Sequence, residues 1–223
     1  MKKLIKGLHQ FRTETFLNHK ELFERLSHGQ SPDALFITCS DSRINPNLIT
    51  HTDPGDLFII RNAGNIVPPQ GTSVTGEIAT IEYALVALGI KDIIICGHTL
   101  CGAMQGLLED KLESMPAVAE WLKYAEATRR LLKDVYNDID DPDALATIAT
   151  QENVLVQLEH LRTLPPVASA LSRGKLNIHG WVYKIQTGEV FAYDPDMGQF
   201  LSISKVSVFQ GAGGLRKLEA RSI

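Results

Sequence analysis

The chain has 223 residues, 44% of them hydrophobic and 22% charged, with a formal net charge of −4. This charge excludes the basic surface typical of nucleic-acid binding, and no apolar run approaches the roughly 20 residues that cross a bilayer. The start lacks the apolar stretch of a secretory signal. We therefore expect a cytoplasmic protein that binds neither nucleic acid nor membrane.

Apolar residues at helical spacing predict one or two amphipathic helices over residues 1–28, which need a surface to dock on. Residues 34–38 are a short apolar run and predict a buried strand that ends at Cys39. Asn45 followed by Pro46 indicates the start of a helix. Residues 57–61 predict a second strand, and the glycine- and proline-rich segment 62–72 predicts a loop.

Between Val74 and Leu88 the apolar residues step by 4, 3, 4 and 3, which predicts a helix capped by Gly89. A third buried strand follows at residues 92–96. Further helices are expected at 104–112, 117–133 and 143–162, with an acidic surface turn at 137–143. A β-hairpin is expected at 176–185 and 189–193, and a loose end with a short basic helix after residue 210.

This order of elements favours an α/β fold: a central, mostly parallel sheet flanked by helices and extended by an antiparallel edge strand. No internal repeat or linker divides the chain. We expect one domain over residues 1–223, with an N-terminal helical arm at 1–28 and a loose C-terminal tail at 206–223.

Two predicted strand ends carry residues with metal-binding chemistry. The first strand runs into Cys39, and the third into the segment that holds His98 and Cys101. Ligands in open α/β sheets bind beyond the carboxyl ends of the strands, so these segments can converge. Two residues separate His98 from Cys101, and a tight turn can present both to one ion. Two thiolates and an imidazole suit zinc, and a missing fourth ligand is typical of a catalytic site.

Other interpretations of the same residues stay open at this point. A cysteine at a strand end is most often an apolar filler, and we assign Cys96 to that class. Asp41 and Arg43 form either a surface salt bridge worth under about 1 kcal/mol, or a carboxylate held beside the metal. Such a carboxylate orients the nucleophile or occupies the open position itself. Cys39 as the nucleophile of a phosphate-binding loop is disfavoured, since Asp41 would repel phosphate.

The motif from Cys39 to Arg43, followed by the one from Cys96 to Ala103, resembles the paired signature of the β-class carbonic anhydrases. The segments 54–58, 61–65 and 81–84 are also similar to that family. The resemblance covers about residues 3–205 and is closest to bacterial and cyanobacterial members. It implies one zinc ion per subunit, held by Cys39, His98 and Cys101, with catalytic Asp41 and Arg43 beside it.

The resemblance also implies a substrate pocket shared across a dimer interface. Gln30 would donate a hydrogen bond to the substrate, and the apolar wall would be formed by Phe58, Ala63 and Tyr83; Gly102 is assigned to substrate binding with them. In the family the N-terminal helices wrap the partner, which gives residues 1–28 their docking surface. A homodimer or higher homo-oligomer is therefore expected.

The implied reaction is the reversible hydration of carbon dioxide to bicarbonate and a proton, by attack of zinc-bound hydroxide. Phe36 stands where the bicarbonate-inhibited subtype has Trp, which favours the plant-like, always-open subtype. Because two thiolates offset the charge of zinc, activity is expected to rise toward alkaline pH. Hydrolysis of carbon disulfide or carbonyl sulfide and a zinc-stabilised scaffold protein are the alternatives, and a carboxysomal location applies if the source is cyanobacterial.

Overall fold

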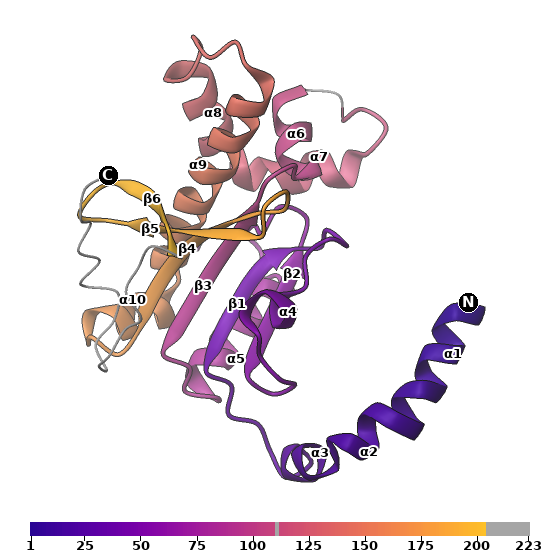
Figure 1. The fold of residues 1–223 in the computed structure, drawn as a ribbon. Helices are drawn as coiled ribbons and strands as arrows, with labels where there is room; N and C mark the ends of the chain where they lie inside the picture. The colour runs from indigo at the N-terminus through magenta and orange to yellow at the C-terminus, as the bar shows by residue number, and fades with distance from the viewer. Residues whose placement is uncertain (110–111, 204–223) are drawn as a thin grey trace.

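The protein, described from a computed structural model over residues 1–109 and 112–203, is built on a six-stranded sheet (Figure 1). The strand order is β2-β1-β3-β4-β5-β6. The bounds are β1 Ala34–Cys39, β2 Leu57–Asn62, β3 Asp92–His98, β4 Asn177–Lys184, β5 Glu189–Asp194 and β6 Gln199–Ser202. The first four strands are parallel, and β5 and β6 add antiparallel pairings. The expected α/β fold with an antiparallel extension of the sheet is confirmed, and β6, which was not predicted, lengthens that extension by one strand. The expected loose tail lies outside the described residues.

The register of the parallel strands brings three of their carboxyl ends to one edge of the sheet. Cys39, the last residue of β1, pairs with Asn62, the last residue of β2. Thr38 pairs with Cys96 of β3, and β3 continues for two more residues to His98. The expected convergence of Cys39 with the segment after β3 therefore follows from strand pairing alone.

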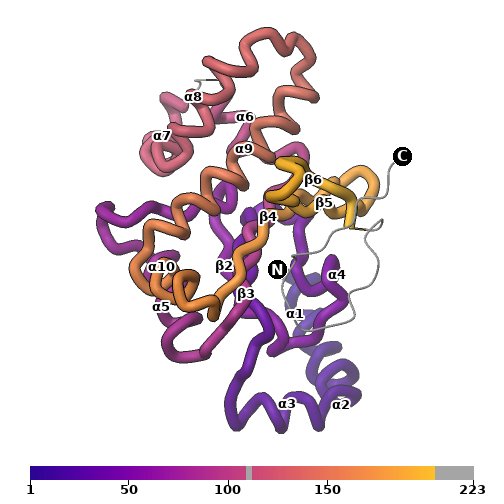
Figure 2. The backbone as a smooth tube through the Cα atoms, turned by 90° about the vertical axis from the view of Figure 1, so that its left-hand side faces the viewer, coloured from indigo at the N-terminus to yellow at the C-terminus, as the bar shows by residue number. Residues whose placement is uncertain are grey.

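Helices cover the sheet and extend beyond its carboxyl edge. Their bounds are α4 Pro46–Thr50, α5 Gly76–Val86, α6 Gly102–Glu109, α7 Pro116–Leu122, α8 Glu126–Asp134, α9 Pro142–Thr163 and α10 Pro165–Ser172. Figure 2 shows α5, α9 and α10 together on one side of the strands. The helices α6, α7 and α8 lie with the first part of α9 beyond one end of the strands (Figure 1). In the described part of the chain, every helix is too short or too polar to cross a membrane.

The observed helices depart from the predicted ones in three places. The helix expected from Val74 begins at Gly76, because Thr75 caps it by accepting a hydrogen bond from the Ile78 N–H. The helix expected at 117–133 is divided into α7 and α8 by a 3₁₀ turn at Lys123–Ala125. The helix α10 was not predicted; its first two residues are prolines, which fit the start of a helix.

The sheet separates two apolar layers, as alternation along the strands requires. Leu35, Ile37, Ile93 and Ile95 belong to the larger layer, which includes residues of α5, α9 and α10. Phe36, Ile94 and Cys96 belong to the layer on the other face. Burial raises the pKa of the Cys96 thiol to about 12, so this thiol stays protonated and inert. The assignment of Cys96 to the core is confirmed.

The N-terminal arm extends away from the sheet (Figure 1). It consists of α1 Lys2–Gln10, a π-helical turn at Phe11–Thr15, α2 Phe16–Asn18 and α3 Lys20–Leu26. None of its helical residues is buried. Leu4, Ile5 and Leu8 are each at least 60% exposed. The predicted helices are present, and the surface on which they dock stays a prediction.

Candidate metal centre

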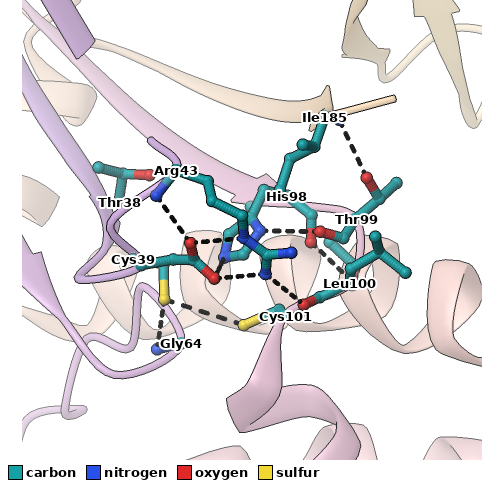
Figure 3. A network of polar contacts seen from close by, with 12 residues as sticks. Thr38, Cys39, Arg43, Gly64, His98, Thr99, Leu100, Cys101 and Ile185 are labelled. Carbon is teal, nitrogen blue, oxygen red and sulfur yellow. Dashed lines mark hydrogen bonds and ion pairs between the residues drawn. The ribbon is translucent and has the colours of Figure 1, made fainter. Parts of the chain in front are cut away.

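Cys39, His98 and Cys101 meet in one buried cluster beyond the carboxyl ends of β1 and β3 (Figure 3). Their candidate ligand atoms all lie within 4.8 Å of one another. The two sulfur atoms are 3.9 Å apart. The three side chains come from the end of β1, the end of β3 and the residue before α6. The convergence predicted for these three residues is therefore present.

The imidazole of His98 is oriented for metal binding. Its Nδ1 donates to the carbonyl oxygen of Thr99 over 2.9 Å, which leaves the lone pair on Nε2. The Nε2 atom is buried, and no described residue gives it a hydrogen-bond partner. A buried polar atom without a partner is costly in a native structure. A cation between this nitrogen and the two sulfurs would satisfy it.

The turn that joins His98 to Cys101 is held in a strained conformation. Leu100 has a φ of 59°, in the left-handed region that residues with a side chain rarely adopt. Thr99 ties this turn to the end of β4: its N–H donates to the Tyr183 carbonyl, and its hydroxyl accepts from the Ile185 N–H (Figure 3). These contacts offset the strain and fix the spacing of the two ligands.

The sulfurs of Cys39 and Cys101 are close enough for one thiol to donate to the other. This contact is the main reason that the pKa of Cys39 is lowered. The same contact, together with burial, raises the pKa of Cys101. A cation bound by both sulfurs would displace the thiol protons, because the thiolate is the form that ligates a metal. Two sulfurs and one imidazole are a donor set that suits zinc.

Asp41 lies beside the cluster and is clamped by Arg43. Arg43 donates from Nε to Oδ1 over 2.9 Å and from Nη2 to Oδ2 over 2.7 Å, and its backbone N–H also bonds Oδ1. The clamp holds the pKa of Asp41 well below its usual range. The Oδ2 atom is 4.0 Å from Nε2 of His98, and the Asp41 side chain is only 15% exposed. These contacts favour a carboxylate held at the metal centre over an isolated surface salt bridge.

Arg61 is a residue of the site that the sequence analysis did not single out. It donates from Nε to the Cys39 carbonyl over 3.1 Å and from Nη2 to the Asp41 carbonyl over 2.7 Å. Arg61 pairs with Thr38 across β1 and β2, one position before Cys39. The planar fork of arginine can hold two carbonyl groups at once, so Arg61 fixes the backbone that carries both Cys39 and Asp41.

The loop after β2 completes the surroundings of Cys39. The N–H of Gly64 donates to the Cys39 sulfur over 3.5 Å. Gly64 has a φ of +80°, and a Cβ there would stand 3.0 Å from the Cβ of Ala103. Only glycine fits this position without strain. Ala63, predicted for the apolar wall, precedes this glycine and therefore lies near the cluster.

Three other residues predicted for the substrate pocket, Gln30, Phe58 and Tyr83, lie away from the metal ligands. Phe58 and Tyr83 contact each other with ring centroids 6.0 Å apart. Phe58 pairs with Leu35, four positions before Cys39, which is about 13 Å along the strand. Gln30 lines a separate cavity of about 460 Å³ beside the turn at 54–56. A single subunit therefore does not gather these three around the ligands, and their roles, with that of Gly102 next to Cys101, stay predictions.

Comparisons with known proteins agree with the geometry. The sequence profile of the carbonic anhydrase family matches residues 34–190, more than half of the chain. The carbonic anhydrase of Synechocystis sp. is 54% identical over 204 residues, which are 91% of this chain and 74% of that relative. The carbonic anhydrase of Pseudomonas aeruginosa is 42% identical over 215 residues, 96% of this chain and 97% of that relative.

Solved structures give the same result. The beta-carbonic anhydrase CcaA matches with a TM-score of 0.89 and 53% identity, over 91% of this chain and 98% of that one. A chain of the tetrameric beta-carbonic anhydrases from Sordaria macrospora matches with a TM-score of 0.79 and 29% identity, over 86% of this chain and 95% of that one.

Proposed function

The chain belongs to the β-class carbonic anhydrase family, and we propose that it hydrates carbon dioxide reversibly at one zinc ion held by Cys39, His98 and Cys101. The observation that carries this proposal is the buried Nε2 of His98, which has no hydrogen-bond partner in the part of the chain that the structure describes and which faces two sulfurs and an ionised carboxylate. The donor set fits zinc, and Asp41 lies beside it.

Zinc at this site would act as a Lewis acid that lowers the pKa of a bound water molecule and so supplies the nucleophile. The residues of the chain do the rest. An ionised carboxylate only accepts hydrogen bonds, so Asp41 would accept a hydrogen bond from the nucleophile. That hydrogen bond would turn a lone pair of the nucleophile's oxygen toward carbon dioxide. Arg43 keeps Asp41 ionised and fixes its orientation through two parallel hydrogen bonds.

The rest of the substrate pocket would come from a second copy of the chain. In one subunit, Gln30, Phe58 and Tyr83 lie away from the metal ligands. The N-terminal arm exposes several large apolar side chains within one short segment, and a partner subunit would bury them; they are Leu4, Ile5, Leu8, Phe11, Phe16 and Leu17. We therefore propose a homodimer or higher homo-oligomer in the cytoplasm, with the carboxysome as the alternative location.

Metal analysis combined with a stopped-flow hydration assay tests the proposal. The purified protein is expected to hold about one zinc per chain, and Cys101→Ala is expected to lose both the metal and the activity. The matched control is Cys96→Ala, which removes a buried thiol outside the cluster and should keep the metal. A wild-type protein with neither zinc nor hydration activity would refute the proposal. An assay with carbonyl sulfide would show whether the same site serves that substrate.

A further inference from the structure

The peptide unit between Ala63 and Gly64 forms a hydrogen bond at each of its two ends. At one end the Gly64 N–H donates to the Cys39 sulfur over 3.5 Å. At the other end the Ala63 carbonyl accepts from Nε1 of Trp121 over 2.8 Å. A peptide unit is planar and its N–H and C=O point in opposite directions, so a contact that fixes one end also aims the other. The indole of Trp121 therefore controls a donor that faces a metal ligand.

The neighbouring carbonyl is fixed in the same way from another helix. Asn153 of α9 donates from Nδ2 to the Gly64 carbonyl over 2.9 Å, and Asn153 is only 1% exposed. The amide of Asn153 is itself held by Gln157, whose Nε2 donates to its Oδ1 over 3.0 Å. Two consecutive carbonyls of this loop are thus bound by side chains from α7 and α9. The loop next to Cys39 has no freedom to turn its N–H away while both contacts hold.

We propose that Trp121 is a positioning residue of the metal centre, which acts on Cys39 through the Ala63–Gly64 peptide unit. A hydrogen bond to the carbonyl polarises the peptide and strengthens its N–H as a donor. A stronger donor draws electron density away from the Cys39 sulfur, and contacts of this kind tune a bound metal. The inference rests on the metal site proposed above, and it assigns Trp121 no contact with substrate.

The chain offers a clean way to remove the indole N–H alone. It contains two tryptophans, Trp121 and Trp181. The Nε1 of Trp181 has no hydrogen-bond partner among the described residues. In a Trp181→Phe background Trp121 is the sole tryptophan, so biosynthetic incorporation of benzothienylalanine replaces only that ring. The analogue keeps the shape of the indole and has sulfur in place of the N–H. Trp121→Phe serves as the second variant.

The readouts are the thiolate-to-metal charge-transfer absorption of cobalt(II)-loaded protein and the hydration kinetics of the zinc form. Loss of the indole donor should move the absorption to longer wavelength, because the sulfur becomes richer in electrons. It should also lower kcat by about fivefold, the effect of one ordinary hydrogen bond, with little change in KM. The Trp181→Phe protein with natural tryptophan should match the wild type in both readouts.

The outcomes separate this inference from the proposed function. Wild-type protein without a charge-transfer band would overturn the metal centre and this inference with it. A normal wild-type band that does not move in the benzothienylalanine protein or in Trp121→Phe would overturn the inference alone. A lowered thermal midpoint with an unchanged band and unchanged kcat would likewise show that Trp121 serves stability only, against the proposal.

Discussion

Asp41 is an unusual carboxylate because it is both desolvated and strongly ionised. Burial alone would favour the protonated form, but three hydrogen bonds from Arg43 outweigh it and lower the pKa of Asp41. A carboxylate that stays ionised at every working pH cannot store the proton that hydration releases. Its expected role is therefore orientation of the nucleophile by accepting its hydrogen bond.

The substitution Asp41→Asn tests this role with little change of shape. The amide keeps one acceptor oxygen but presents a donor to Arg43, which breaks the clamp and removes the charge beside His98. We expect hydration activity to fall by at least about a hundredfold, as when one preorganised hydrogen bond to the reacting group is removed. Zinc content should stay at the wild-type level, since Asp41 is not one of the three ligands, and metal analysis on the assayed sample checks this. Unchanged kcat with bound zinc would contradict the orienting role.

The residues found from sequence and those missed differ in how they act. Cys39, His98 and Cys101 were predicted because their side-chain chemistry and spacing indicate a set of metal ligands. The roles of Arg61 and Trp121 were missed because these side chains bind backbone carbonyls, and a carbonyl is present at every residue. No residue pattern marks which carbonyl a distant side chain will reach. Gly64 was quoted only as part of a family motif, whereas its positive φ and its contact with Ala103 need coordinates.

At the scale of elements, α9 packs directly on the backbone of β3 and β4, two central strands of the sheet. The site lies at the end of β3. A Cβ at Gly97 of β3 would lie 2.9 Å from Cγ2 of Val154, and a Cβ at Gly180 of β4 would lie 2.9 Å from its Cγ1. Val154 is fully buried between these glycines. This close approach sets the distance from α9 to the sheet. It thereby places Asn153, which binds the loop beside Cys39.

Substitution at Gly180 measures how tightly this contact is packed. We expect Gly180→Ala to lower the free energy of unfolding by about 1–3 kcal/mol, because the added methyl overlaps Val154 and Leu158. Val154→Ala removes one of these obstacles. The double variant should therefore be more stable than the sum of the two single effects predicts. Urea unfolding at fixed protein concentration gives the coupling, and strictly additive effects would show that α9 shifts freely.

The alternation of short apolar runs with helical spacing was enough to predict β1, β2, β3 and the hairpin of β4 and β5. It was not enough for α10 or β6. The helix α10 opens on Pro165 and Pro166, which look like helix breakers unless the first turn is known to begin there. The strand β6 has four residues, and its pairing with β5 rather than its composition makes it a strand.

At the scale of the whole molecule, one subunit brings the metal ligands together but does not bring the predicted substrate residues to them. All three ligands come from one chain and meet without help. Gln30, Phe58 and Tyr83 lie elsewhere on the subunit, and the arm at residues 2–26 presents apolar side chains to solvent. If a second copy covers the arm and supplies these residues, metal binding and catalysis should be separable by breaking the assembly.

The double substitution Leu4→Glu/Leu8→Glu tests this on the exposed apolar face of α1. Both side chains are more than 60% exposed, so the change should not disturb folding of the subunit. Charges on this face oppose its burial against a partner. We expect light scattering to show monomers, hydration activity to fall at least tenfold, and zinc content to stay the same. Loss of zinc together with activity would mean instead that the assembly forms the metal centre itself.

The control for charge is Lys3→Gln/Lys6→Gln, which lowers the net charge by the same two units on another face of α1. It should keep both the assembly and the activity of the wild type. An arm variant that is monomeric and fully active would contradict the shared pocket, and Gln30, Phe58 and Tyr83 would then lose their assigned roles. A monomeric variant with bound zinc and no activity would separate the two halves of the site: a metal centre that each chain builds alone, and a substrate wall that only the partner completes.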